Sequence, residues 1–270
     1  GRLSLKKMIL SPTSTKIQSI YNPDVTYVTT DEPAESVGRI MQKYDLVAIP
    51  VVDSIGRLVG RITIDDVVDV IREEAEKDYQ MMSGISQDVE SSDTIWDQTK
   101  ARLPWLIIGL FGGMLAAYMI SFYEADIALF PATAMFIPVI TAMGGNVGIQ
   151  SSAIVVKGLA SNTLTSKNIL QSISKEISCA VINACICSSI IFILSLCFNL
   201  TSLAMPITVT ISLFIVIMFA SMFGTAFPLL LNKLKIDPAL ATGPFITLTN
   251  DIIGLNIYLF TGKAILGWLL

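Results

Sequence analysis

The stretch LPWLIIGLFGGMLAAYMISF, residues 103–122, decides the fold class of this chain. It contains no charged residue, and about 20 apolar residues let an α-helix cross the roughly 30 Å hydrocarbon core of a bilayer. Residues 127–156 and 177–232 are uncharged as well. As a single helix, residues 177–232 would extend about 84 Å, so we expect this run to fold back near residues 199–206. Five transmembrane helices are predicted, at about 103–124, 127–156, 172–198, 206–231 and 239–262.

Charge divides the chain into two unlike parts. Residues 1–100 hold 17 acidic and 11 basic residues, whereas residues 101–270 hold 5 acidic and 7 basic residues. The first part is therefore predicted to be a soluble acidic domain and the second a membrane domain. The acidic excess favours a cationic partner and excludes nucleic acid. The chain has no histidine, and its four cysteines all lie between residues 179 and 197, so a zinc site is not expected.

The lysines predict how the chain is oriented in the plasma membrane. If residues 1–100 are cytoplasmic, the first external loop carries Glu124 and Asp126, and five lysines fall in cytoplasmic loops. Cytoplasmic loops of membrane proteins are enriched in Lys and Arg, so this orientation is the expected one. It leaves the C-terminus outside, with Lys263 near the outer interface. The five lysines are Lys157, Lys167, Lys175, Lys233 and Lys235.

Residues 25–71 predict a small α/β unit in the order β–α–β–β–α. The segments VTYVT, VAIPVVD and RLVGRI are typical of strands, and AESVGRIMQKY is typical of a helix. Thr63 is followed three residues later by Asp66, which is the spacing of a capping box at a helix start.

The helix that begins after Thr63 is strongly acidic. At 100° per residue, four of its acidic residues share one stripe about 80° wide, and two more line another side. Such a run can be a solvated helix face. The sharper hypothesis is a divalent-cation site, because Mg²⁺ and Ca²⁺ prefer carboxylate oxygens. The four are Asp66, Asp69, Glu73 and Glu76, and the two are Glu74 and Asp78.

The last predicted span places a single carboxylate, Asp251, in the apolar stretch FITLTNDIIGLNIYLF, residues 245–260. Ionisable residues inside a membrane are expensive and functional by default. The uncharged runs 103–122, 127–156 and 177–232 contain no basic residue, and neither do residues 239–262, so we expect the counter-charge of Asp251 to be a mobile cation. The alternative is a protonated, hydrogen-bonded structural carboxyl.

Polar and small residues near Asp251 suggest an ion path. Thr247, Asp251, Gly254 and Tyr258 are spaced i, i+4, i+7 and i+11 and share one stripe of a helix. The preceding residues 242–244, Thr-Gly-Pro, predict a break that frees backbone carbonyls, which membrane proteins tolerate where the backbone lines a cavity.

A second polar patch is the stretch GGNVGIQSS, residues 144–152. Asn146 and Gln150 are four residues apart and can share a helix face. The glycines allow an irregular backbone at a functional site, but ordinary close packing of helices by small residues explains them equally well.

Longer segments of this chain resemble a known family. The segment YDLVAIPVVDSIGRLVGRITIDDVVDVI (44–71) resembles the second half of a CBS domain, and GRLSLKKMIL (1–10) resembles the tail of a preceding one. The segments PVITAMGGNVGIQSSAIVVKGLA (138–160) and DPALATGPFITLTNDIIGLNIY (237–258) are similar to the most characteristic parts of the MgtE family of magnesium channels.

This resemblance implies a multi-domain membrane protein. An α/β CBS domain is followed by an acidic connecting helix and an all-α bundle of five transmembrane helices. The family's upstream acidic domain and most of its first CBS domain are expected to be missing. The implied domains are the tail of a first CBS domain at 1–20, a second CBS domain at 21–71, the connecting helix and linker at 72–100, and the pore domain at 101–270.

The resemblance also implies a homodimer with a Mg²⁺ pore on or near its two-fold axis, lined by the second and fifth helices and used for magnesium uptake. Asp251 matches the aspartate that recognises hydrated Mg²⁺. Gly243 stands where some members have a polar side chain, so only its backbone is expected to take part. The implied pore residues are Asp251, Thr247, Gly243, Gly254, Asn146 and Gln150.

The resemblance further implies that cytosolic Mg²⁺ closes the channel by bridging carboxylates. Lys77 stands where an acid is expected. CBS domains often bind adenine nucleotides such as ATP, and Thr63 and Asp66 lie where such a ligand would be held. The matching acidic residues are Glu35, Asp45, Asp66, Asp69, Glu74, Asp78 and Asp237.

Two other functions are weighed against the channel. In a secondary divalent-cation transporter, coupled to protons or sodium, Asp251 would bind the ion and the coupling partner alternately. A CBS-regulated membrane enzyme is disfavoured, because the sequence contains no histidine and no pattern of a nucleophile with its base.

Overall fold

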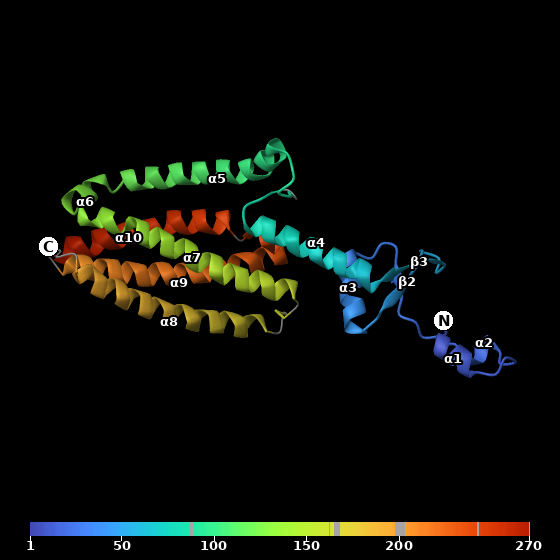
Figure 1. Cartoon of the computed structure of the whole chain (residues 1–270). Coiled ribbons are helices and arrows are strands. Elements are labelled where there is room, and N and C mark those ends of the chain that lie inside the picture. The colour runs from blue at the N-terminus through green and yellow to red at the C-terminus, as the bar shows by residue number, and fades with distance from the viewer. Residues whose placement is uncertain (87–88, 162, 165–167, 198–202, 242, 270) are drawn as a thin grey trace. The chain divides into compact units, whose positions relative to one another are not determined.

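The computed structural model describes residues 1–270 except 87–88, 162, 165–167, 198–202, 242 and 270 (Figure 1). The described residues form two compact units, 1–76 and 77–270. The boundary falls inside helix α4 (Ile64–Met82), so the acidic helix leaves one unit and enters the other.

The first unit contains the predicted β–α–β–β–α order, which is confirmed. Its three strands form one sheet in the order β1–β2–β3, with β1 parallel to β2 and β3 antiparallel to β2. Two short helices precede the sheet. The elements are α1 (Leu5–Leu10), α2 (Ile17–Ile20), β1 (Val28–Thr29), α3 (Ala34–Lys43), β2 (Ala48–Val52) and β3 (Leu58–Thr63).

The core of this unit lies where α3 and α4 cover the sheet. Its buried side chains are Val28, Val37, Met41, Ile49 and Val67. They come from two strands and two helices, so both layers must be present before the apolar surface leaves water.

The predicted capping box at the start of α4 is present. The carboxylate oxygen Oδ2 of Asp66 accepts the backbone N–H of Thr63 over 2.9 Å and its hydroxyl over 2.6 Å. These two hydrogen bonds hold the pKa of Asp66 below its ordinary value. Both residues lie at the surface of the unit, where a ligand can reach them.

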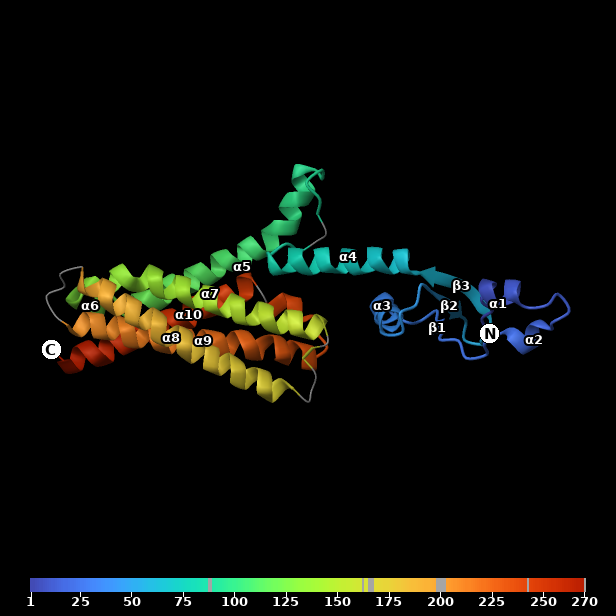
Figure 2. The ribbon, with the colours of Figure 1, turned by 60° about the horizontal axis from the view of Figure 1, so that its bottom comes forward.

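The second unit is a bundle of long helices, as predicted (Figures 1 and 2). Among the described residues, α5, α7, α8 and α9 are long and apolar enough to cross a membrane. The fifth predicted span, α10, carries Asn250, Asp251, Asn256 and Lys263, and its crossing stays a prediction. The elements are α5 (Ile95–Ser121), α6 (Glu124–Leu129), α7 (Ala132–Ala160), α8 (Ile169–Leu196), α9 (Ala204–Lys233), the 3₁₀ turn η1 (Pro238–Ala241) and α10 (Pro244–Leu269).

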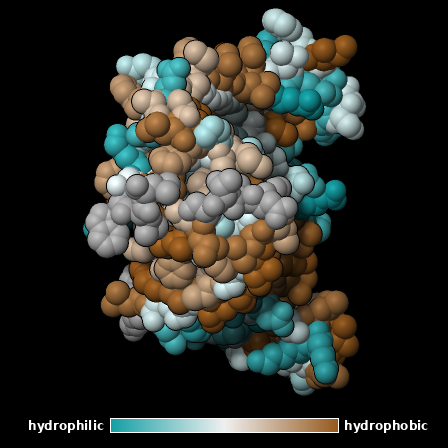
Figure 3. Space-filling model, turned by 90° about the vertical axis from the view of Figure 1, so that its left-hand side faces the viewer, coloured by the Kyte–Doolittle hydropathy of each residue, from teal (hydrophilic) through white to brown (hydrophobic). Residues whose placement is uncertain are grey.

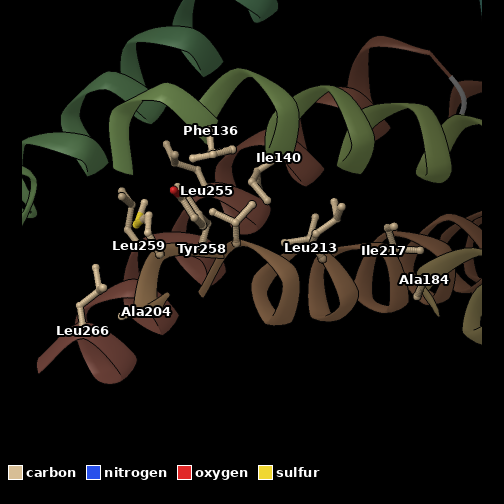
Figure 4. Packing of buried hydrophobic residues seen from close by; sticks show 13 residues of the cluster. Phe136, Ile140, Ala184, Ala204, Leu213, Ile217, Leu255, Tyr258, Leu259 and Leu266 are labelled. Carbon is tan, nitrogen blue, oxygen red and sulfur yellow. The ribbon is translucent and has the colours of Figure 1, made fainter. Parts of the chain in front are cut away.

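Helix α9 is the most buried of these helices and packs against α7, α8 and α10, while α5 packs against α10. Figure 4 shows the core between them, where Phe136 and Ile140 of α7 meet Leu213 of α9 and Leu255 of α10. The end at which α6 lies shows apolar and hydrophilic patches side by side (Figure 3). Along the helices, large apolar side chains such as Leu106, Leu110 and Phe111 of α5 are exposed, so apolar residues lie on the outside of the bundle as well as in its core.

Several helix ends differ from the prediction for local reasons. Helix α5 begins at Ile95 rather than 103, because Thr94 caps it by accepting the N–H of Asp97 over 3.3 Å. The predicted span 127–156 is split before Pro131 into α6 and α7. Residues 199–202 of the predicted turn lie outside the described residues, and α9 already begins at Ala204.

Candidate cation-binding site

The candidate site lies where the first half of α10 passes α7. Asp251 and Thr247 are one turn apart on α10, and both are half-buried. A β-carbon added to Gly145 of α7 would lie 3.3 Å from Thr247 Cγ2 and 3.7 Å from Asp251 Oδ1. The absence of a side chain at Gly145 therefore leaves the carboxylate beside a bare helix backbone.

Gly148 of α7 and Gly224 of α9 let the helices α7, α9 and α10 pack closely together. A β-carbon on Gly148 would lie 1.9 Å from Nδ2 of Asn250, and one on Gly224 of α9 would lie 2.4 Å from the carbonyl oxygen of Gly148. Both separations are far below van der Waals contact. These two glycines are therefore packing residues, and they fix how α7 sits against α9 and α10. For Gly148, close packing was one of the two explanations that the sequence left open.

The two amides predicted for the site lie on a surface of the chain. Asn146 and Gln150 are exposed, and their spacing of four residues puts them on one face of α7. Asn146 directly follows Gly145, which contacts Asp251 and Thr247. Exposed amides on a membrane helix need water or a polar partner, so this face is suited to a water-filled path or an interface.

Two residues of the predicted stripe, Gly254 and Tyr258, do not line the candidate site with Asp251. Gly254 is buried, with the position of its β-carbon 3.2 Å from Val216 of α9. Tyr258 is fully buried, and its hydroxyl donates to the carbonyl oxygen of Thr133 over 2.8 Å. The four residues lie on one face of α10. The neighbouring helices cover Gly254 and Tyr258 and leave Thr247 and Asp251 half-buried.

A residue that the sequence patterns missed is Asn250. Its side chain is fully buried, and within the described part of the chain neither its amide nitrogen nor its amide oxygen has a hydrogen-bond partner. Buried polar groups are nearly always paired. Its neighbour Asp251 drew attention because it is charged, whereas an asparagine gives no comparable signal.

The break before α10 packs against the last residue of α4 and the residues that follow it. Gly243 has φ +64°, and a β-carbon there would lie 2.2 Å from the carbonyl oxygen of Met82. Gly84 has φ +78°, and a β-carbon there would lie 2.7 Å from Pro244. A cavity of about 700 Å³ adjoins this contact and reaches Thr247 and Trp105. The contact between residues 82–84 and 243–244 is called the glycine seat below.

These segments agree with those of known proteins. A family model described as a divalent cation transporter, MgtE, matches residues 137–261, and a CBS domain model matches residues 17–73. The MgtE match includes Gly145, Asn146, Thr247 and Asp251.

Residues 137–261 belong to the MgtE family.

Curated relatives extend the match over nearly the whole chain. The magnesium transporter MgtE of Bacillus subtilis is 36% identical over 96% of this chain, and that of Thermus thermophilus is 32% identical over 98%. Both are named as transporters and not as enzymes. The chain spans only 57% and 59% of their lengths. A solved cytosolic domain of the Mg²⁺ channel MgtE in complex with ATP is 50% identical over 25% of this chain and 27% of that one, with a TM-score of 0.25.

Within either unit, the acidic residues that the MgtE resemblance assigned to Mg²⁺ sensing form no metal-binding group among the described residues. No group of three or more acidic, cysteine or histidine side chains there is close enough to hold a metal. Asp237 is exposed, and its Oδ1 accepts the N–H of Ala239 over 2.9 Å, so it caps the start of the turn η1. Glu35, Asp45, Asp66, Asp69 and Glu74 are exposed in the first unit, and Asp78 is half-buried in the second.

The charges nearest to Asp251 do not neutralise it. Lys263, one of the flanking charges on the chain, forms an ion pair with Asp126 of α6 over 3.0 Å. The ion pairs of the described residues do not include Asp251. The carboxylate of this MgtE relative is therefore left without a fixed positive partner among those residues.

Proposed function

We propose that this chain forms a channel that conducts Mg²⁺ into the cell, with Asp251 in the ion path. The single observation that carries the proposal is the half-buried carboxylate beside Thr247 and the bare backbone of Gly145, with no cationic side chain paired to it in the described residues. A charge in that position is stabilised by a passing cation.

The proposed ion is hydrated Mg²⁺. This ion dehydrates reluctantly, so carboxylates that contact its bound waters select it without removing them. The similar proteins of B. subtilis and T. thermophilus are named magnesium transporters, which supports this choice.

The proposed assembly is a homodimer in the plasma membrane. Asp251 carries only half of the charge that neutralises a divalent ion, and a two-fold axis beside it would supply a second carboxylate. The exposed amides of Asn146 and Gln150 would then face the axis instead of lipid. The lysines near the ends of α7 and α9, Lys157 and Lys233, favour cytoplasmic placement of those ends and of residues 1–100.

The test is Mg²⁺ flux into liposomes that contain the purified chain. Asp251→Asn keeps the shape of the side chain and removes its charge, so we expect flux to fall at least tenfold, because one charge at the path is worth more than about 1.4 kcal/mol. Glu124→Gln is the matched control, since this exposed carboxylate lies in α6 outside the proposed path. Equal flux in Asp251→Asn and the unchanged chain would refute the proposal.

The same preparation separates a channel from a coupled transporter. A channel shows unitary currents in a planar bilayer, whereas a carrier moves protons or sodium in fixed ratio to Mg²⁺. Observation of a fixed ratio without unitary currents would replace the channel by the transporter.

Gating by cytosolic Mg²⁺ is a further part of the proposal. Carboxylates that repel one another are stabilised together by a bound cation, so Mg²⁺ would favour a closed packing by its higher affinity for that state. Asp78 and Asp237 belong to the same unit as the pore helices. We expect open probability to fall as cytosolic Mg²⁺ rises, and to fall less in Asp78→Asn. An open probability that is independent of Mg²⁺ would rule out sensing.

An adenine nucleotide is the proposed ligand of the CBS unit. Thr63 and Asp66 offer a hydroxyl and a carboxylate at the surface, already held together by two hydrogen bonds. We expect ATP to bind the intact chain and Asp66→Ala to weaken it, as measured by calorimetry. If ATP bound the Asp66→Ala variant with unchanged affinity, the nucleotide would not bind at Thr63 and Asp66.

A further inference from the structure

Helix α8 carries one carboxylate, Glu176, that reaches two other helices. The hydroxyl of Ser151 on α7 donates to Oε1 of Glu176 over 2.6 Å, and the hydroxyl of Ser221 on α9 donates to the same oxygen over 3.0 Å. Both serines are buried and Glu176 is half-buried. One carboxylate oxygen therefore joins α7, α8 and α9.

The position of Glu176 calls for a counter-charge. Helix α8 is among the helices that are long and apolar enough to cross a membrane, and Glu176 lies next to Lys175 at the edge of its uncharged part. Ionisable residues in membrane helices are rare and mark ion or proton pathways. The ion pairs found in the described residues do not include Glu176.

The three oxygens form a closed triangle, because the two serine hydroxyls are themselves 3.2 Å apart. Each hydroxyl has one proton. When both protons are donated to the ionised carboxylate, none remains for the edge between Ser151 and Ser221, and lone pairs face each other there. A cation next to the triangle would be attracted to all three oxygens at once.

The size of the triangle suits Mg²⁺. This ion holds its octahedral ligands at about 2.0–2.1 Å, so neighbouring ligand oxygens lie about 2.9 Å apart. The edges of 2.6, 3.0 and 3.2 Å lie on both sides of that value. Ca²⁺, with ligands at about 2.3–2.6 Å, would need longer edges.

A cavity beside Glu176 leaves room for water around an ion. Its volume is about 260 Å³, and Ser172 and Thr225 contribute to its lining. Mg²⁺ in proteins usually keeps several waters and binds one or two carboxylates, and each water occupies about 30 Å³ in the liquid. The cavity therefore has room for the waters of an ion bound to Glu176, although Ser151 and Ser221 do not contribute to its lining.

This cluster is separate from the Asp251 site. Ser151 lies six residues beyond Gly145 along α7, a distance of about 9 Å in a helix, and Gly145 is the residue that contacts Asp251. We propose that Glu176, Ser151 and Ser221 form a second site for a divalent cation of the size of Mg²⁺, which ties α7, α8 and α9 together. The proposal goes beyond the path through Asp251, and its test requires no transport.

The experiment uses Mn²⁺ as a paramagnetic probe and a nitroxide on Cys179. This exposed cysteine lies three residues after Glu176 on α8, so it is a neighbour on the helix surface. The other three cysteines are replaced by serine, and Asp251→Asn removes the proposed pore ligand. In the full chain with Glu176 we expect Mn²⁺ to broaden the nitroxide spectrum, and excess Mg²⁺ to reverse the broadening.

The matched variant is Glu176→Gln in the same background. Its amide oxygen still accepts from both serines, so the packing is retained, but the charge that binds the ion is lost. We expect the broadening to disappear, while the midpoint of thermal unfolding without Mn²⁺ stays the same. Ser151→Ala should lower Mn²⁺ affinity about tenfold. Equal broadening in the chain that keeps Glu176 and in the Glu176→Gln variant, or none in either, would overturn the proposal.

Discussion

Gly243, at the break before α10, lies directly against the backbone of Met82. A β-carbon at Gly243 would lie 2.2 Å from the carbonyl oxygen of Met82, and φ of Gly243 is +64°. Only glycine meets both conditions without strain.

Gly243→Ala is expected to disrupt the glycine seat. The left-handed backbone costs about 1–2 kcal/mol for alanine, and the clash with Met82 adds to it, so the segment after α4 should separate from α10. Under the proposed gating, Mg²⁺ flux at high cytosolic Mg²⁺ should then rise. Gly113→Ala is the control, because nothing lies within 4 Å of that position. Flux that stays suppressed in Gly243→Ala would contradict the expected coupling.

Gly148→Ala is expected to lower stability by about 1–3 kcal/mol, which is typical of overpacking. The new methyl group would meet Nδ2 of Asn250 at 1.9 Å. The variant Gly148→Ala with Asn250→Ala should recover part of the loss, because the clashing amide is removed. Denaturant unfolding of the parent, the two single variants and the double variant measures this coupling. If the losses of stability in the two single variants simply add up in the double variant, the close contact is absent.

Tyr258→Phe distinguishes a buried tyrosine from one that lines the ion path. Removal of the hydroxyl leaves the carbonyl of Thr133 without its 2.8 Å donor, which should cost about 1–3 kcal/mol of stability. Relative flux of Mg²⁺ and Ca²⁺ should be unchanged. Tyr118→Phe, at an exposed position, is the control for loss of a phenol. A change of ion selectivity in Tyr258→Phe would show that this residue lines the ion path.

Asp66→Ala should give a loss of stability that depends on pH. Hydrogen bonds from Thr63 lower the pKa of Asp66, so the carboxylate binds protons less readily in the folded chain than in the unfolded chain. Its stabilising effect is present above the ordinary aspartate pKa of about 4 and is lost as pH falls through the lowered value. The midpoint of thermal unfolding should differ between variant and parent at pH 7, and the difference should vanish in acid. A constant difference would contradict the linkage.

Much of the fold could be predicted because it depends on patterns that are local in the sequence. Uncharged runs marked the long helices, and the capping spacing of Thr63 and Asp66 located the start of α4. The carboxylate at Asp251 was detectable because a charge in an apolar run stands out.

The rest depends on which elements meet, and one helix does not encode that. The stripe from Thr247 to Tyr258 defined a face of α10, but α9 and α7 cover its second half. Asn250 and Met82 carry no signal of their own and matter through their contacts. Glu176 only borders the uncharged run 177–232 and forms no pattern in the sequence, although Ser151 and Ser221 meet it from two distant segments.

The ion pair between Lys263 and Asp126 and the bond from Tyr258 to Thr133 both fasten α10 beyond Asp251. At its other end this helix begins in the glycine seat, a contact of bare backbone. Helix α10 is therefore fastened in two different ways: side-chain bonds hold its C-terminal half, whereas close packing against glycines, at Gly243 and Gly148, holds its N-terminal half. Asp251 lies between these two kinds of attachment, so its position depends on packing that a larger side chain at either glycine would disturb.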